Sequence, residues 1–365
     1  MKVGLLTSSR ADYSIYYPLL KLLNGDPFFD LSIIAFGTHL SKDYGYTIDQ
    51  IIQDGFTIAE KIETLPQDDS PVSISHAIGI TVSKFSELWG KSYYDYVICL
   101  GDRYEMFAAC VATIPFNIKL VHIHGGEKTL GAIDDCFRHS ITHMASIHFT
   151  AAEPYRNRVI NLKENSEHVY NVGALSFDNL KSMRLLSTSE FLEKFKIDLA
   201  IKSILITFHP ETVSFERNVL YIEILIDVLK DLSGYQYIIT MPNADTMGNI
   251  IRDKLNLFIE ETPHAIGIES FGTIGYLSCM KYCSFMMGNT SSGFIEAAFF
   301  NKPVINLGSR QNGRIITPNI INSDITRESV IKAIQGISML DRTEEIKIYG
   351  DGNTAERILT ILKKI

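Results

Sequence analysis

Short apolar runs alternate with amphipathic stretches along most of this chain. The run at residues 2–6 predicts a buried strand, and the next stretch predicts a helix, because its apolar positions recur at nearly helical spacing. Strands that alternate with helices predict an α/β fold built on parallel sheets. We expect further strands at residues 31–36, 56–62, 96–100, 120–123, 146–150, 168–172, 204–207, 237–241, 265–268, 284–287 and 303–306. We expect further helices at residues 72–89, 216–232, 247–260, 274–280 and 353–365. We also expect one between the runs at 96–100 and 120–123, one after the loop that leads to Asp134-Asp135, and one that continues from the loop at 288–293 through Glu296 and Ala298.

The pattern blurs between about residues 173 and 200 and then starts again, which predicts two domains of similar architecture. The length of 365 residues also exceeds the usual size of a domain with a single hydrophobic core. We place an N-terminal Rossmann-like domain at residues 1–172 and a C-terminal one at 173–345. The last helix, within 346–365, is expected to pack back on the N-terminal domain. Two such halves with loops facing a common cleft are typical of sugar-nucleotide enzymes.

Composition narrows the class of protein. The net charge of −8 argues against general binding of nucleic acid or membrane surfaces. The five cysteines lack the density of a disulfide framework, and Cys279 and Cys283 lack the second ligand pair that zinc needs. We therefore expect a reduced, cytoplasmic protein without a metal site. The longest apolar stretch falls short of the roughly 20 residues that span a bilayer.

Ionisable residues cluster where strands of the N-terminal half are expected to end. Asp102 follows the run at 96–100, His124 and Glu127 follow the run at 120–123, and Asp134 comes shortly after. Ligands of open parallel sheets bind at the carboxyl ends of strands. Carboxylates shielded there from water can transfer protons near neutral pH. The alternative is a structural ion-pair network, to which we assign Glu105.

In the C-terminal half, the loop at residues 288–293 is expected to lie between a strand and a helix. Small residues there let backbone N–H groups approach a phosphate, and the hydroxyls of Thr290, Ser291 and Ser292 can donate as well. A capped helix start is an equally simple explanation. Arg10 and Arg310, each after a strand, favour phosphate binding, because arginine matches phosphate oxygens.

Three further residues are candidates for ligand contact. Arg103 is the natural partner of a leaving phosphate. Glu296 could accept hydrogen bonds from two ribose hydroxyls, or could simply complement the helix dipole. His209 is rigidly placed, because the following Pro210 restricts its backbone to extended geometry. The chain has no Walker lysine motif, no G-x-G-x-x-G and no G-x-S-x-G, so ATP, dinucleotides and a serine nucleophile have little support.

At these positions the chain resembles the hydrolysing UDP-N-acetylglucosamine 2-epimerases of bacterial sialic-acid and legionaminic-acid synthesis, which are similar to the epimerase half of the mammalian bifunctional enzyme. The matching motifs occur in order along nearly the whole chain. They are Ser9-Arg10-Ala11-Asp12-Tyr13, Gly101-Asp102-Arg103, Gly125-Gly126-Glu127, Asp134-Asp135 with Arg138-His139, His209-Pro210, Gly288-Asn289 with Ser291, Asn306-Leu307-Gly308 with Arg310-Gln311, and Tyr349-Gly350-Asp351-Gly352.

The resemblance implies a glycosyltransferase-B-like fold with UDP in the interdomain cleft. It implies proton transfer by Asp102 and Asp134. One departure is that many members carry a glutamate where this chain has His124, so either His124 or Glu127 could take the third acid/base role. The loop at residues 128–133 is also one residue longer than in some relatives. The resemblance implies that UDP contacts Arg10, Ser14, Arg103, His209, Asn243, Thr290, Ser291, Glu296 and Arg310.

The expected activity is conversion of UDP-N-acetylglucosamine and water into N-acetylmannosamine and UDP, through a glycal, for sialic-acid synthesis. The first alternative is the same chemistry on UDP-N,N'-diacetylbacillosamine. A glycosyltransferase or a silent UDP-sugar sensor is a second alternative on the same fold. The chemistry requires no metal or redox cofactor. The expected partners are the UDP-sugar, the UDP product and further copies of the chain, as a homodimer or homotetramer.

Overall fold

The computed structural model describes residues 1–242, 245–246, 248–340 and 345–365. The chain divides into two compact units. Unit 1 comprises Met1–Glu127, Ile133–Lys181 and Lys347–Ile365, and unit 2 comprises Lys128–Ala132 and Ser182–Ile346. The short segment Lys128–Ala132 therefore groups with unit 2, although the chain on both sides of it belongs to unit 1.

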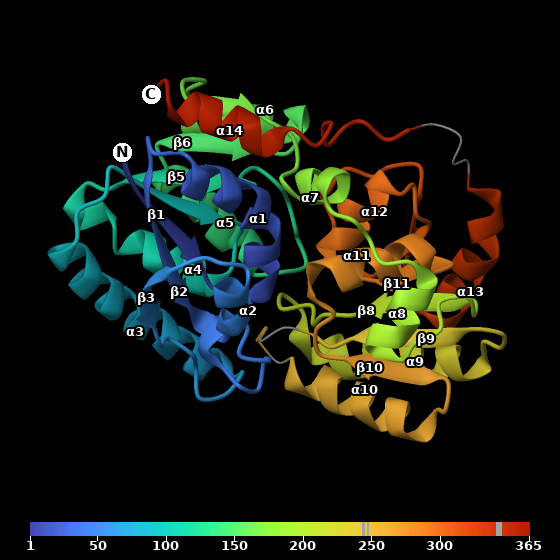
Figure 1. Cartoon of the computed structure of the whole chain (residues 1–365). Coiled ribbons are helices and arrows are strands. Elements are labelled where there is room, and N and C mark those ends of the chain that lie inside the picture. Colours follow the sequence, from blue (N-terminus) through green and yellow to red (C-terminus); the bar gives the residue numbers. More distant parts are fainter. Residues whose placement is uncertain (243–244, 247, 341–344) are drawn as a thin grey trace. The chain divides into compact units, whose positions relative to one another are not determined.

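Unit 1 is built on a parallel sheet of seven strands among the described residues (Figure 1). The strand order is β3-β2-β1-β4-β5-β6-β7, and every neighbouring pair is parallel. The strands are apolar on both faces because helices cover both sides of the sheet. Their bounds are β1 Lys2–Thr7, β2 Asp30–Phe36, β3 Ile58–Ile62, β4 Tyr96–Leu100, β5 Lys119–Ile123, β6 Ile147–Thr150 and β7 Val169–Asn171.

Helices α1 (Arg10–Gly25), α2 (Ile48–Gln53) and α14 (Thr354–Leu362) share one hydrophobic core with one face of this sheet. The buried residues of α1 recur at helical spacing, and the apolar face of α14 packs against them. A second core lies on the opposite face. It is covered by α3 (Pro71–Lys91), α4 (Tyr104–Val111) and α5 (Asp134–Met144). Two further helices are α6 (Glu153–Lys163) and α7 (Ser176–Ser182).

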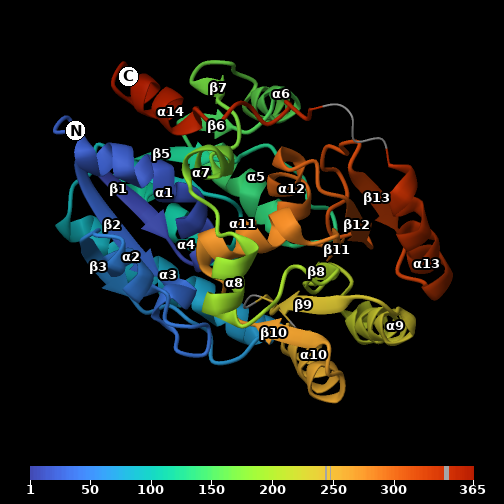
Figure 2. The same ribbon diagram turned by 45° about the vertical axis from the view of Figure 1, so that its right-hand side comes forward.

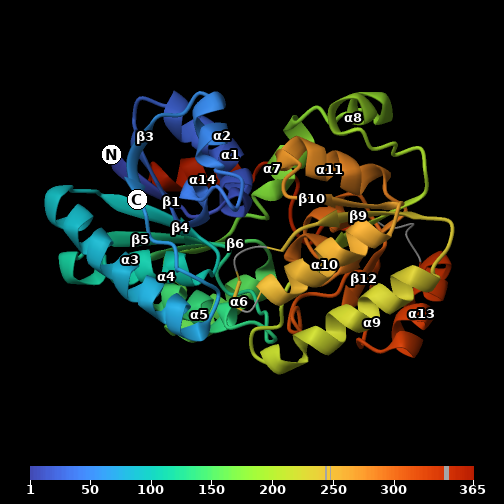
Figure 3. The ribbon, with the colours of Figure 1, turned by 90° about the horizontal axis from the view of Figure 1, so that it is seen from below.

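Unit 2 is built on a second parallel sheet, whose six described strands follow the order β10-β9-β8-β11-β12-β13 (Figure 2). Helices α9 (Asn218–Asp231), α10 (Asn249–Glu261) and α13 (Arg327–Gly336) lie on one face of it and share its core (Figure 3). The other helices are α8 (Thr188–Phe195), α11 (Gly272–Tyr282) and α12 (Glu296–Phe299). The strands are β8 Ser203–Thr207, β9 Gln236–Thr240, β10 Ala265–Ile268, β11 Phe285–Gly288, β12 Val304–Leu307 and β13 Ile320–Ser323.

The predicted α/β class with two Rossmann-like domains is confirmed. The helix predicted through Glu296 and Ala298 is confirmed, and it is short. The chain there makes a 3-10 turn at Ser291–Gly293 and then only the four-residue α12. It stops because Asn301 adopts a left-handed backbone and Pro303 leads into β12. The sequence patterns missed β13 and the helices α2, α6 and α13, as well as α7 and α8 in the stretch between about residues 173 and 200.

In each sheet the strand order reverses direction at one place, between β1 and β4 in unit 1 and between β8 and β11 in unit 2. Loops on either side of such a reversal diverge and leave room for a ligand at the carboxyl ends of the strands. The two reversals are therefore where a functional site is expected. Of the helices that the structure describes, none combines the length and the apolar character that a membrane crossing requires.

Candidate active site

Arg10 and Ser14 lie just after β1, in the first turns of α1. The loop before them is fixed by the buried carboxylate of Asp12. Oδ2 of Asp12 accepts a hydrogen bond from the Ser8 amide at 2.7 Å, and Oδ1 accepts one from the Ser9 amide at 2.9 Å. These bonds satisfy backbone donors that the start of a helix leaves unpaired. The side chain of Asp12 thus holds the chain at the β1 side of the reversal.

Asp102 follows β4, on the other side of the same reversal, and forms an ion pair with Arg138 of α5. Arg138 is 1% exposed in its side chain, whereas Asp102 is 25% exposed. The same guanidinium donates through Nη1 to Asp135 Oδ1 and to the Glu127 carbonyl, both at 3.2 Å. A buried guanidinium thus brings the strand end after β4, the strand end after β5 and the start of α5 together. Asp134 is the first residue of α5 in this group.

His124 and Glu127 are bonded to each other. Nδ1 of His124 lies 2.8 Å from Oε1 of Glu127, and both residues are buried. In the tautomer in which Nδ1 donates to the carboxylate, Nε2 is left as the acceptor. Nε2 is buried and has no hydrogen-bond partner among the described residues. His124 also has φ +65, a left-handed conformation that is unusual for a residue with a side chain and that is found at functional sites.

Arg103 lies next to Asp102, but its guanidinium is directed to a neighbouring carboxylate. Nε and Nη2 of Arg103 both donate to Oε1 of Glu105 at 3.1 Å, and Glu105 is fully buried. Glu105 therefore belongs to an ion pair, in agreement with its sequence-based assignment. The pair fixes the orientation of Arg103 at the β4 side of the reversal.

In unit 2, His209 follows β8 and is held through its backbone by Asn289, which follows β11. The His209 amide donates to Asn289 Oδ1 at 2.7 Å, and Asn289 Nδ2 donates to the His209 carbonyl at 2.8 Å. This reciprocal pair joins the two strand ends on either side of the second reversal. The ring Nδ1 of His209 lies 3.5 Å from Oδ2 of the buried Asp245.

Arg310, after β12, lies in the same group. Its Nη1 donates to the Asn289 carbonyl at 3.3 Å, and its Nη2 lies 3.8 Å from Asp245 Oδ2. Nε of Arg310 is buried and has no hydrogen-bond partner in the described part of the chain. The backbone of this loop is fixed by Glu211, whose Oε1 accepts from the Ser309 amide at 2.6 Å and from the Arg310 amide at 3.1 Å.

The hydroxyls after β11 form a chain of their own. Oγ of Ser292 lies 3.2 Å from Oγ1 of Thr290 and 2.6 Å from the hydroxyl of Tyr276. Burial raises the pKa of Tyr276, so its hydroxyl stays protonated. Ser291 begins the 3-10 turn and Glu296 begins α12. A four-residue helix has little dipole, so an argument for phosphate binding rests on the hydroxyls and backbone amides instead.

The structure thus groups the candidate residues within each unit. In unit 1, Arg138 pairs with Asp102 and donates to the Glu127 carbonyl, and the Glu127 carboxylate is hydrogen-bonded to His124. Asp134 precedes Asp135 in the chain, and Arg138 also binds Asp135. In unit 2, Asn289 connects His209 and Arg310. Asn243 lies outside the described residues. The sequence reading gave no role to Arg138, Asn289 and Glu211, although all three lie in stretches that it noted. Arg138 lies four residues after Asp134, Glu211 two residues after His209, and Asn289 directly before Thr290. Among the described residues, no cluster of histidine, cysteine and acidic side chains could hold a metal ion.

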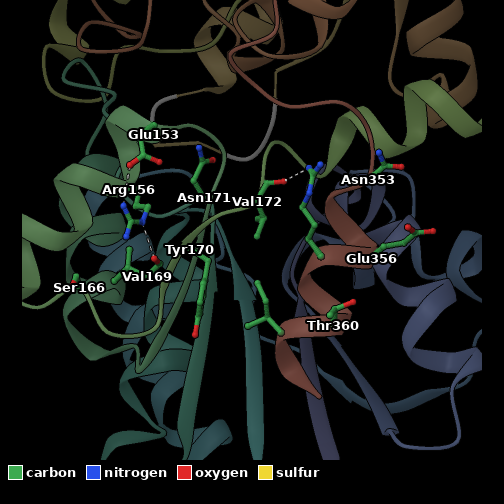
Figure 4. A pocket seen from close by; sticks show the side chains of 12 residues that line it. Glu153, Arg156, Ser166, Val169, Tyr170, Asn171, Val172, Asn353, Glu356 and Thr360 are labelled. Atoms are coloured by element: carbon green, nitrogen blue, oxygen red, sulfur yellow. Dashed lines mark hydrogen bonds and ion pairs between the residues drawn. The ribbon is translucent and has the colours of Figure 1, made fainter. Parts of the chain in front are cut away.

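A surface pocket of about 830 Å³ lies elsewhere in unit 1, between α6, β7 and α14 (Figure 4). Arg156 and Arg357 line this pocket, and each is hydrogen-bonded to neighbouring groups. Arg156 donates to Glu153 and to the Val169 carbonyl, and Arg357 donates to the Val172 carbonyl. None of the candidate residues lines this pocket. Its lining is Glu153, Arg156, Ser166, Val169, Tyr170, Asn171, Val172, Asn353, Glu356, Arg357, Thr360 and Ile361.

Comparison with known proteins identifies relatives along the whole chain. Residues 21–363 match the family described as UDP-N-acetylglucosamine 2-epimerase. A Campylobacter jejuni protein named "GDP/UDP-N,N'-diacetylbacillosamine 2-epimerase (hydrolyzing)" is 36% identical over 325 residues, which is 89% of this chain and 84% of that protein. A Legionella pneumophila protein named "UDP-N,N'-diacetylbacillosamine 2-epimerase (hydrolyzing)" is 33% identical over 364 residues, covering 100% of this chain and 96% of the other.

Solved structures give the same picture of the fold. The crystal structure of UDP-GlcNAc 2-epimerase from Neisseria meningitidis bound to UDP-GlcNAc superposes with a TM-score of 0.84 over 100% of both chains, at 17% identity. At that identity the likeness speaks for the fold alone, and it confirms the glycosyltransferase-B-like class expected from the sequence.

Proposed function

This chain belongs to the UDP-N-acetylglucosamine 2-epimerase family, and we propose that it is a hydrolysing 2-epimerase of a UDP-activated 2-acetamido sugar. The observation that carries the proposal is that two relatives above 30% identity, which cover most or all of the chain, are both named as hydrolysing 2-epimerases. Two contacts in unit 1 support proton chemistry: the ion pair of Asp102 with the buried Arg138, and the hydrogen bond between His124 and Glu127.

In the proposed reaction, a base takes the proton from carbon 2 while the bond from carbon 1 to the UDP oxygen breaks. The electron pair of the C–H bond forms the C1–C2 double bond of a glycal, and UDP leaves with the bonding pair of the C–O bond. Water then adds its oxygen to carbon 1, and an acid delivers a proton to the opposite face of carbon 2. The sum is UDP-sugar plus water giving the 2-epimeric free sugar plus UDP.

These steps need at least two proton-transfer groups and a cationic clamp on the departing diphosphate. We assign proton transfer to Asp102, Asp134 and the His124–Glu127 pair. In that pair Glu127 would orient the imidazole, and Nε2 of His124 would exchange the proton. We assign binding of UDP to Arg10, Ser14, Arg103, His209, Asn243, Thr290, Ser291, Ser292, Glu296 and Arg310.

Two substrates come into question. The sequence resemblance favours UDP-N-acetylglucosamine, which would give N-acetylmannosamine. The names of the Campylobacter and Legionella relatives favour UDP-N,N'-diacetylbacillosamine, and we propose it as the first candidate. Residue identities at these positions do not separate the two sugars, which differ at carbons 4 and 6.

The test is turnover in deuterium oxide with each UDP-sugar, followed by NMR of the products. We expect a free sugar with one deuterium at carbon 2 and inverted configuration there, and UDP in equal amount. A labelled but intact UDP-sugar would indicate a non-hydrolysing epimerase. An unlabelled free sugar with unchanged configuration would indicate a glycosyltransferase acting on water and would refute the proposal. The sugar with the higher kcat/KM identifies the substrate.

A further inference from the structure

The segment Lys128–Ala132 connects Glu127 to Ile133 and Asp134, yet it packs within unit 2. The Leu130 amide donates to the Asn312 carbonyl at 3.0 Å, and the Gly131 carbonyl lies 3.5 Å from the Val213 amide. Both ends of this segment therefore lead to residues assigned to proton transfer, while its middle lies against the loop that carries Arg310.

The closest approach is made by Gly131. A Cβ added to Gly131 would lie 2.5 Å from Cα and 2.7 Å from N of Arg310, and 2.8 Å from the Ser309 carbonyl carbon. These are backbone atoms, so no side-chain rotation can relieve the overlap. The backbone of Gly131 does not adopt the left-handed conformation that favours glycine. The position thus excludes a side chain because of space and not because of φ.

We infer that Gly131 is a positioning residue, which lets the segment between Glu127 and Asp134 lie against the Arg310 backbone and thereby couples nucleotide binding to proton transfer. The inference rests on the proposed function. Glu211 accepts hydrogen bonds from the backbone amides of Ser309 and Arg310, and Gly131 packs against the Arg310 backbone. The Arg310 guanidinium in turn contacts Asn289, which fixes His209. A shift of the loop by a few tenths of an ångström would therefore displace groups assigned to UDP.

The test is a double-mutant cycle of Gly131→Ala and Arg310→Ala, read out by calorimetric titration with UDP. Each single variant should weaken UDP binding about tenfold or more, the scale of a lost hydrogen bond to a charged group. If Gly131 acts through Arg310, the double variant should bind UDP no more weakly than Arg310→Ala alone. Additive losses, or unchanged affinity in a folded Gly131→Ala protein, would overturn the inference.

Turnover distinguishes coupling from simple loss of affinity. Gly131→Ala should lower kcat as well as UDP affinity, because the displaced segment carries Glu127 and Asp134 at its ends. Unchanged kcat at saturating substrate would overturn the coupling. The matched control is Gly79→Ala on α3, where an added Cβ meets nothing within 4 Å. This control should leave binding and turnover as in the wild type.

Two safeguards keep the result decisive. If thermal unfolding shows that Gly131→Ala is not folded, the same double-mutant cycle is made with Glu211→Gln. This substitution keeps the side-chain shape but weakens the two hydrogen bonds from the backbone amides of the Arg310 loop. Non-additive loss with Arg310→Ala would then support the positioning of Arg310 by its backbone, and additive loss would overturn it. A wild-type protein that binds no UDP would refute the proposed function itself, and this inference with it.

Discussion

Two buried, neutral histidines on one face of the unit 1 sheet should make this protein unfold in acid, because they must gain a positive charge as the pH falls. His122 on β5 and His148 on β6 are cross-strand partners and are almost fully buried. Burial lowers the pKa of His122 from 6.5 to about 4 and the pKa of His148 from 6.5 to about 3. The positive charge that His122 gains on protonation would further oppose protonation of His148.

The sign and size follow from proton linkage. Each histidine has a pKa in the folded protein that lies below its unfolded value of 6.5. At pH values between these two, the unfolded chain therefore binds more protons than the folded protein. Stability is therefore fully present above about pH 6.5 and is lost as the pH falls towards 4. At about pH 4.5 each histidine lowers the free energy of unfolding by about 2 to 3 kcal/mol relative to neutral pH, using about 1.4 kcal/mol per pKa unit.

The assay is urea unfolding of the wild type and of His148→Leu at about pH 7.5 and pH 4.5. Between these two conditions the variant should lose about 2 to 3 kcal/mol less unfolding free energy than the wild type, because it has one fewer buried imidazole to charge. His76→Leu is the control, since His76 is exposed on α3 and should leave the pH dependence unchanged. An equal loss of stability in the wild type and in His148→Leu would refute the reasoning.

Two substitutions test the assignment of proton transfer. Asp102→Asn should nearly abolish turnover but change UDP affinity by no more than about threefold from the wild type. The amide keeps the shape of the carboxylate, and Arg138 keeps its hydrogen bond to Asp135. Activity within tenfold of the wild type would remove Asp102 from the catalytic residues. His124→Ala and Glu127→Gln should both lower kcat. If Glu127 only orients the imidazole, the loss should be larger in His124→Ala. A larger loss in Glu127→Gln would assign proton transfer to Glu127.

The alternation of apolar runs and amphipathic stretches was sufficient to predict the α/β class, most strands and the division into two Rossmann-like domains. It could do so because burial on both faces of a parallel sheet requires continuous apolar strands. Strand ends could also be recognised, since glycine and ionisable residues replace the apolar run there, as at Gly101-Asp102 and Gly288-Asn289. Several helices were not predicted from the pattern, among them α6, α8 and α13.

Tertiary structure decided which of these side chains meet. Arg138 pairs with Asp102 because β4 and β5 are neighbours in the sheet and α5 follows β5. Glu211 fixes the backbone of Arg310 across 99 residues of sequence. Local sequence patterns carry no information on such pairs, because their distances depend on strand order and on where each crossover returns. Local sequence also gives no reason for glycine at position 131. A side chain is excluded there only because the Arg310 backbone packs against Gly131.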